Sequence, residues 1–349
     1  MSEVQNAEEC LRAGRLSLFN SEHDICLANG SSSFVAPIVA QQFSNDCVGI
    51  MDFVLPDVSK HKVWGWDSVV CKQLAALGAK EEELPSASYL EQVRKLSHRR
   101  YAKLCKEFVF GRFPNPELLC DIEPAELPQL DSIVQTVNAY ADAILKAPWS
   151  GSGRGIRKIR ADEFTQSDLG WCRKVLQKQG SIMVERRQKL ALDFSLQFFV
   201  EADAVHFEGF AIFEAQNCSY TSNLLASNEH ILKLLSKYIP ENKMLELKDL
   251  IAQYLSSAFL GNYRGVLGVD MFVTEDGRVA PCIEINVRNN MGMVSRRVYE
   301  QLKNTMPDGQ CTMRVVNAKS HDALMQKLKN SRLLLTDPGE KALYAIAVY

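Results

Sequence analysis

The stretch GVLGVDMFVTEDGRVAPCIEINVR, residues 265–288, decides the predicted fold. Two apolar runs flank the sequence EDG at 275–277, which predicts two antiparallel strands joined by a tight turn. Asp270 lies in the first run, and Glu284 and Asn286 lie in the second. Because side chains alternate along a strand, Glu284 and Asn286 project from the same face. Acidic side chains inside apolar strands are costly to bury, so their position needs a reason.

Two explanations fit these acidic positions. If Asp270 points to the face that carries Glu284 and Asn286, three oxygen ligands converge. Mg²⁺ prefers such ligands and completes its coordination with water and substrate phosphates. Alternatively, Glu284 forms an ion pair with Arg288 or Lys146 across an otherwise ordinary sheet.

Upstream, the segment KAPWSGSGRGI at residues 146–156 is rich in glycine and serine. Glycine exposes backbone N–H groups and permits positive φ, so such a loop can wrap a phosphate. It is not a Walker A loop, because the lysine precedes the glycines, and its G-x-G-x-G spacing is not the dinucleotide fingerprint. An ordinary hairpin turn is the alternative. Because Mg²⁺ usually binds substrate phosphates as well as protein ligands, a phosphate-binding loop in the same chain favours the magnesium site over the ion pair.

The composition is typical of a globular, enzyme-sized chain. A length of 349 residues predicts two or three packed lobes, and the net charge of −2 argues against a nucleic-acid surface. The ten cysteines show no C-x-x-C and the six histidines no paired spacing, so neither a zinc site nor a disulfide framework is predicted. The N-terminus lacks the apolar core of a signal peptide and no run is long enough to span a membrane, so we expect a cytoplasmic protein.

The pattern along the chain predicts an α/β protein of several lobes. Strands and helices alternate up to a charged, proline-containing boundary near residue 88, and a long basic helix follows at 88–108. Strands surround the glycine loop and a helix covers 164–180, while 194–215 alternates with period two as a hairpin that turns at 202–203. We expect three units, at 1–88, 89–185 and 186–349.

The sequence resembles the ATP-grasp superfamily of carboxylate-amine and carboxylate-thiol ligases. The resemblance is carried by LKAPWSGSGRGI, by IMVERR, and by GVDMF followed by CIEINVR, and it covers about residues 90–300. It implies an ATP-grasp fold preceded by a Rossmann-like N-terminal α/β domain. It also implies ATP and Mg²⁺ as cofactors, with Mn²⁺ as a substitute.

The resemblance also implies roles for individual residues. Lys146 would contact the ATP phosphates, Glu185 would accept a hydrogen bond from the adenosine, and Arg288 would stabilise the transferring phosphoryl group or an acyl phosphate. Their alternatives are a surface lysine, an ion pair of Glu185 with a neighbouring arginine, and a structural partner of Glu284. Asp193 is either a ribose contact or a surface carboxylate. The remaining implied residues are Ser150, Gly151, Ser152, Gly153 and Gly155 of the flap over the phosphates, Val184, Arg186 and Arg187 whose backbone would read the adenine, and the metal ligands Asp270, Glu284 and Asn286.

Two segments are candidates for binding the substrates. NNMGMVSRRVY at 289–299 is similar to the segment with which D-alanyl-D-alanine-type ligases hold a carboxylate, although Met291 replaces the usual proline. There Gly292, Ser295, Arg296 and Arg297 would join Arg288 in binding a substrate, the alternative being exposed arginines at the start of a helix. FNSEHDICLANGSSS at 19–33, with His23, Asp24 and Asn29, is either part of an acceptor pocket or a capped turn.

The function implied is an ADP-forming carboxylate-amine ligase. It would act through an acyl phosphate on a small amino-acid or peptide-like substrate. A kinase of the same fold and a nucleotide-binding module without catalysis are the alternatives. Because the three expected metal ligands and Arg288 are all present, catalysis is favoured. The expected partners are a small carboxylate and a small amine, without nucleic acid or membrane, and the chain is compatible with a homodimer.

Overall fold

The computed structural model describes residues 64–349 except 77–78, 151–154, 217–218 and 336–343. The predicted Rossmann-like N-terminal domain, including the segment 19–33, therefore lies mostly outside the described residues. Its described part contains α4 (Ser68–Ala76). Within the described residues, no helix is both long and apolar enough to cross a membrane.

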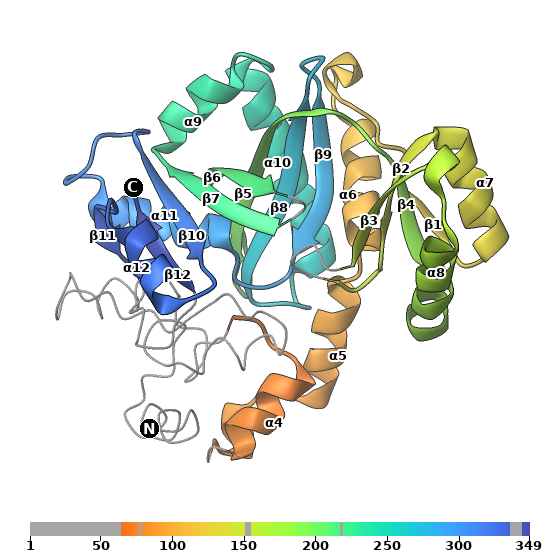
Figure 1. Cartoon of the computed structure of the whole chain (residues 1–349), viewed down its shortest axis with the longest axis horizontal. Coiled ribbons are helices and arrows are strands. Elements are labelled where there is room, and N and C mark those ends of the chain that lie inside the picture. The colour runs from red at the N-terminus through yellow and green to blue at the C-terminus, as the bar shows by residue number, and fades with distance from the viewer. Residues whose placement is uncertain (1–63, 77–78, 151–154, 217–218, 336–343) are drawn as a thin grey trace.

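The larger of two sheets in the described part of the chain has eight strands, and every neighbouring pair is antiparallel. It runs across the middle and left of Figure 1, with helices on both of its faces. Its strands, in spatial order, are β11 (Leu333–Leu334), β12 (Tyr344–Val348), β10 (Cys311–Asn317), β7 (Ser219–Leu225), β6 (Val205–Gln216), β5 (Leu190–Val200), β8 (Gly265–Thr274) and β9 (Val279–Asn286).

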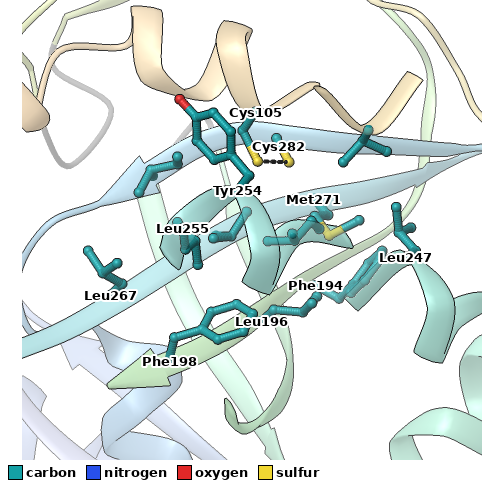
Figure 2. Packing of buried hydrophobic residues seen from close by; sticks show 14 of the residues in the cluster. Cys105, Phe194, Leu196, Phe198, Leu247, Tyr254, Leu255, Leu267, Met271 and Cys282 are labelled. Carbon is teal, nitrogen blue, oxygen red and sulfur yellow. Dashed lines mark hydrogen bonds between the residues drawn. The ribbon is translucent and has the colours of Figure 1, made fainter. Parts of the chain in front are cut away.

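One face of this sheet is apolar and the other is polar near β5, β8 and β9. On β5, Phe194, Leu196 and Phe198 are completely buried in the largest core cluster (Figure 2). The alternate positions carry Asp193, Ser195 and Gln197, which must face the opposite side of the sheet. Helices that contribute to the apolar cluster are α5 (Ala87–Leu96), α6 (Arg100–Phe110), α9 (Asn228–Leu235) and α10 (Glu241–Phe259).

Two cysteines join α6 to β9 within this core. The Sγ atoms of Cys105 and Cys282 are 2.8 Å apart, and both residues are buried (Figure 2). Cys282 has a φ of +56°, which is uncommon for a residue other than glycine. It lies where the register of β8 and β9 shifts, two residues before Glu284. The irregularity is thus located beside the predicted metal ligand.

The smaller sheet contains four antiparallel strands in the described residues and lies on the right of Figure 1. α7 and α8 cover one of its faces, where Ala143, Leu145 and Val184 are buried. The other face carries Ile144, Lys146 and Glu185, because these alternate with the buried set. Its elements are β1 (Ala125–Leu127), β4 (Ile182–Arg186), β2 (Asp142–Lys146), β3 (Ile156–Arg160), α7 (Leu130–Tyr140) and α8 (Gln166–Gln179).

The single long helix predicted at 88–108 is wrong, because the chain forms α5 and α6 with a break at residues 97–99. Ser97 Oγ donates to the Val93 carbonyl and ends α5. The backbone N–H of Arg99 donates to the Pro148 carbonyl, 3.1 Å away, rather than to the preceding helical turn. A hydrogen bond to a residue distant in sequence therefore interrupts the helix, although the local sequence favours a continuous one. Both helices pack on the large sheet, although they fall in the predicted unit 89–185, and the unit boundaries stay a prediction.

Several local predictions are confirmed. The helix α8 begins with a capping box between Thr165 and Asp168 and ends at Gly180, whose φ is +80°. The hairpins β5–β6 and β8–β9 form as the alternation predicts, the second with Gly277 at φ +87° in its turn. The described elements not yet placed are α11 (Met291–Leu302), α12 (His321–Leu328) and three short 3₁₀ turns, Glu81–Glu83, Pro116–Leu118 and Ala161–Glu163.

Candidate functional site

The predicted oxygen ligands come together on the polar face of the large sheet. Asp270 and Glu284 are directly opposite each other on β8 and β9, and Asn286 is two residues further along β9. Asn286 Nδ2 donates to Asp270 Oδ2 at 2.9 Å, so its carbonyl oxygen is turned away from that carboxylate. The structure therefore brings two carboxylates and one amide group together, with the amide nitrogen facing the Asp270 carboxylate.

The charges at this place are strongly coupled. Burial, and after it the negative charge of Glu284, raises the pKa of Asp270 to about 7. Burial alone would also raise the pKa of Glu284, but the positive charges of Arg99, Lys146 and Arg288 outweigh it and keep that pKa below its usual value. A divalent cation would relieve the repulsion between the two carboxylates, so the donor set fits Mg²⁺. Nowhere in the described part of the chain, this place included, do three or more His, Cys, Asp or Glu side chains gather as a metal site; here two carboxylates are joined by an amide.

Arg99 is a residue of the candidate site that the sequence analysis did not single out. Its Nη1 lies 3.0 Å from Glu284 Oε2, and its side chain is only 5% exposed. Glu284 thus forms its ion pair with Arg99, which corrects the expectation of Arg288 or Lys146. Arg99 also donates to the Ala147 carbonyl from Nε and to the Ser150 carbonyl from Nη2, both at 3.2 Å. The missed signal is the sequence SHRR, where a basic helix stops and starts again.

Lys146 and Glu185 form a buried ion pair on the face of the small sheet opposite α7 and α8. Lys146 Nζ lies 2.6 Å from Glu185 Oε2, and the two side chains are 7% and 8% exposed. Lys146 is therefore not a surface lysine, and Glu185 is paired with it rather than with a neighbouring arginine. Lys146 Nζ also donates to the Ile283 carbonyl of β9 at 3.4 Å. This lysine connects the small sheet to the strand that carries the predicted metal ligands.

The glycine loop begins and ends in the described part of the chain. The Ala147 N–H donates to the Gly155 carbonyl at 2.8 Å, which closes the base of the loop. A Cβ on Gly155 would lie 2.2 Å from Ser150 Cβ, so a side chain does not fit there. The predicted residues Gly151, Ser152 and Gly153 lie outside the described residues.

The strand predicted to contact adenine, β4, pairs with a neighbouring strand at each of its edges. Val184 pairs with Ala125 on β1 and with Leu145 on β2. The backbone N–H groups of Arg186 and Arg187 donate to the Ile122 and Asp142 carbonyls. Their side chains form ion pairs with the carboxylates of Glu123 and Asp142. The N–H groups of both arginines are therefore occupied, and their role toward a nucleotide stays a prediction.

Arg288 follows β9 directly and lies close enough to act on both carboxylates. Asp270 and Glu284 raise its pKa, but burial outweighs them and lowers it below the usual value. Its Nη1 donates to the Asn289 carbonyl at 3.1 Å. Arg99, Lys146 and Arg288 thus place three positive charges around the oxygen ligands.

The other residues predicted to bind substrate lie on α11, and most of their side chains form hydrogen bonds or ion pairs within the protein. Ser295 Oγ donates to the Gly292 carbonyl, and a Cβ on Gly292 would lie 2.3 Å from Gln197 Nε2. Arg296 is 5% exposed and donates to the Ala226 carbonyl, so it is not an exposed arginine. Arg297 forms an ion pair with Glu208. The structure does not bring the guanidinium groups of Arg296 and Arg297 to the oxygen ligands, and their role stays a prediction.

Asp193 lies on the same face of β5 as Ser195, which is opposite Asp270 in the register. Burial raises the pKa of Asp193 to about 6, while Lys158 of β3 lowers it. Lys158, on the small sheet, thus lies near enough for its charge to act on Asp193 of the large sheet. A separate, open cavity of about 710 Å³ lies between β6, β7 and β10, and none of the predicted site residues lines it.

Comparison with known proteins supports the fold. No family model matches the sequence, and no curated protein does. Among solved structures, the carboxyaminoimidazole ribonucleotide synthase of Aspergillus clavatus in complex with ATP is 14% identical and matches 99% of this chain and 90% of its own, with a TM-score of 0.50. The biotin carboxylase domain dimer of Hydrogenobacter thermophilus 2-oxoglutarate carboxylase, with ADP, MgADP and bicarbonate, is also 14% identical. It matches 77% of this chain and 65% of its own, with a TM-score of 0.51.

At this identity the likeness shows the fold and not the reaction. Both structures belong to the ATP-grasp superfamily. The mixed α/β architecture with two antiparallel sheets agrees with theirs. The described part of the chain therefore has the ATP-grasp fold that the resemblance implied, and the Rossmann-like N-terminal domain stays a prediction.

Proposed function

We propose that this chain is an ATP-dependent, ADP-forming carboxylate-amine ligase that acts on a small amino-acid or peptide-like substrate. One observation carries the proposal. The oxygen ligands Asp270, Glu284 and Asn286 lie together, and the cationic groups of Arg99 and Lys146 reach them from the base of the glycine loop. A triphosphate with its cation requires this combination of acidic ligands and positive charges.

The nucleotide would lie between the two sheets. The face of the small sheet opposite α7 and α8 carries Lys146 for the phosphates and Glu185 for the adenosine, and the partly exposed Ile144 offers an apolar surface for the base. The buried Lys146–Glu185 ion pair would separate when phosphate and adenosine take over its two ends. Asp270, Glu284 and Asn286 would hold Mg²⁺, whose chemistry is to neutralise charge on the phosphate oxygens.

The reaction depends on electrostatics more than on a nucleophilic side chain. A substrate carboxylate that attacks the γ-phosphate adds negative charge to a site that already holds a triphosphate. Arg288, beside Asp270 and Glu284, would stabilise this charge and the resulting acyl phosphate. By analogy with other phosphoryl-transfer sites, one such arginine is worth roughly 10³–10⁵ in rate. An amine would then attack the acyl phosphate to give an amide, ADP and phosphate.

Product analysis tests the proposal. The protein is mixed with ATP, Mg²⁺ and pools of small carboxylates and amines, and free phosphate is measured. We expect phosphate release that requires both a carboxylate and an amine, with ADP formed in equal amount. A stable phosphorylated product without amine dependence would show a kinase instead. Nucleotide binding without turnover in any pool would contradict a catalytic function.

A further inference from the structure

The segment 147–150, the first part of the glycine loop, is fixed through each of its backbone carbonyls. Arg99 donates to three of them, from Nε to Ala147, from its backbone N–H to Pro148 and from Nη2 to Ser150, at 3.1–3.2 Å. The carbonyl of Trp149 accepts from Gln179 Nε2 at 3.2 Å. Four consecutive peptide groups are therefore held by two side chains and one backbone N–H.

Trp149 is held from three elements at once. Its backbone N–H donates to Gln179 Oε1 at 2.8 Å, so the Gln179 amide, at the end of α8, bonds both polar groups of this residue. Its indole Nε1 donates to the Arg94 carbonyl of α5 at 2.8 Å. The His98 ring contacts the indole edge to face at 4.4 Å, and the Arg94 guanidinium lies 4.9 Å from its centre.

These contacts act on Arg99. Its Nε and Nη2 are bound to carbonyls on either side of Trp149, and its Nη1 lies 3.0 Å from Glu284 Oε2, within ion-pair distance. If the segment 147–150 moved, the carbonyls that orient the guanidinium would move with it. The position of Nη1 beside Glu284, a predicted metal ligand, therefore depends on the hydrogen bonds that fix Trp149.

We infer that Gln179 and Trp149 are positioning residues that hold the guanidinium of Arg99 at the phosphate end of the nucleotide site. The inference rests on the proposed function, since it assumes that this site binds a nucleotide with its cation. Neither residue is part of the sheet face that would contact ATP. Both lie partly exposed at the junction of the small sheet with α5 and α6, so their loss should affect nucleotide binding more than folding.

The first experiment compares Gln179→Met with Gln177→Met. Methionine has a similar shape but forms none of the hydrogen bonds of glutamine, and Gln177 is exposed on the same helix. Affinity for a non-hydrolysable ATP analogue with Mg²⁺ is measured by calorimetry, and the urea midpoint is measured alongside. We expect Gln179→Met to weaken binding roughly 10-fold, as losses of outer-shell partners typically do. Gln177→Met should bind as the parent does, and the two urea midpoints should agree closely.

A double-mutant cycle with Arg99→Met separates positioning from a merely structural role. If Gln179 acts through Arg99, the variant Arg99→Met/Gln179→Met should bind the analogue within twofold of Arg99→Met alone. If the double variant instead loses affinity by the product of the two single effects, the inference is overturned. If Gln179→Met does not fold, Trp149→Phe repeats the test. This substitution keeps an aromatic ring but removes the indole N–H that donates to the Arg94 carbonyl, and Trp171→Phe is its control.

The outcomes distinguish this inference from the proposed function. If the parent chain does not bind the analogue, both are overturned. If the parent binds it and Gln179→Met binds equally well, the positioning role is wrong and the proposed function stands. Weaker binding in Gln179→Met, with no further loss in the double variant, supports both.

Discussion

Arg99 Nη1 lies 3.0 Å from Glu284 Oε2, and this ion pair joins the start of α6 to the strand that carries the predicted metal ligands. The two residues are 185 positions apart in sequence, and the same guanidinium also holds the segment before the glycine loop. Glu284 therefore has a structural partner in addition to its proposed role toward a cation.

The variant Arg99→Met should be much less stable than the neighbouring Arg100→Met. Removing one partner of a buried ion pair typically costs about 3–5 kcal/mol, and this variant also loses the hydrogen bonds of Arg99 to the Ala147 and Ser150 carbonyls, while Lys146 and Arg288 still act on Glu284. Arg100 pairs with Glu126 but its side chain is 51% exposed, so its loss should cost less than about 1 kcal/mol. Urea unfolding of both variants measures the difference. Equal losses would show that the Arg99–Glu284 contact contributes no more than a surface pair.

The pair Lys146–Glu185 should show strong coupling in stability. Lys146→Met leaves the Glu185 carboxylate buried without its partner, and we expect a loss of about 3–5 kcal/mol. The double variant Lys146→Met/Glu185→Met removes both charges and should recover most of that stability. Neither variant should bind the ATP analogue. Urea unfolding of the two single variants and the double variant measures the coupling. If the losses of stability in the single variants add up in the double variant, the two side chains do not stabilise each other.

Asp193 should make the protein less stable as pH rises from 4 to 7. Its pKa is raised from 3.8 to about 6 by burial, so between these values the folded state binds more protons than the unfolded state. The free energy of unfolding therefore falls as Asp193 ionises. Asp193→Asn should be more stable than the parent by about 1–2 kcal/mol at pH 7, and the gain should vanish near pH 4.

Urea unfolding of Asp193→Asn across this pH range measures the effect. Asp203→Asn, in the exposed turn that follows β5, is the matched control and should show no such pH-dependent gain. A constant difference between Asp193→Asn and the parent at all pH values would mean that burial does not perturb this carboxyl.

Two glycines near the loop should respond to alanine in opposite ways. A Cβ on Gly155 would lie 2.2 Å from Ser150 Cβ, so Gly155→Ala forces the base of the loop apart and should cost about 1–3 kcal/mol. Gly170 lies inside α8, and no described atom would come within 4 Å of its added Cβ. Gly170→Ala should therefore stabilise the protein by up to about 1 kcal/mol. Thermal or urea unfolding compares the two, and a tolerated Gly155→Ala would contradict the close contact.

The sequence predicted what depends on local patterns. Strand alternation correctly placed Glu284 and Asn286 on one face, and the helix predicted over 164–180 forms as α8. It did not predict the break between α5 and α6, because the Arg99 N–H bonds Pro148, which is distant in sequence. The partner of Glu284 and the engagement of Arg296 were missed for the same reason. Long-range pairing leaves no periodic signal in the chain.

The most direct test of the central claim is the magnesium dependence of nucleotide binding in Glu284→Gln. Binding of the ATP analogue is titrated with and without Mg²⁺, and Glu275→Gln, in the exposed turn of the same hairpin, is the control. If Asp270, Glu284 and Asn286 hold the cation, Mg²⁺ should strengthen binding in the parent and in Glu275→Gln, and Glu284→Gln should lose that gain, roughly 10–100-fold or more. An unchanged magnesium dependence in folded Glu284→Gln would contradict the account.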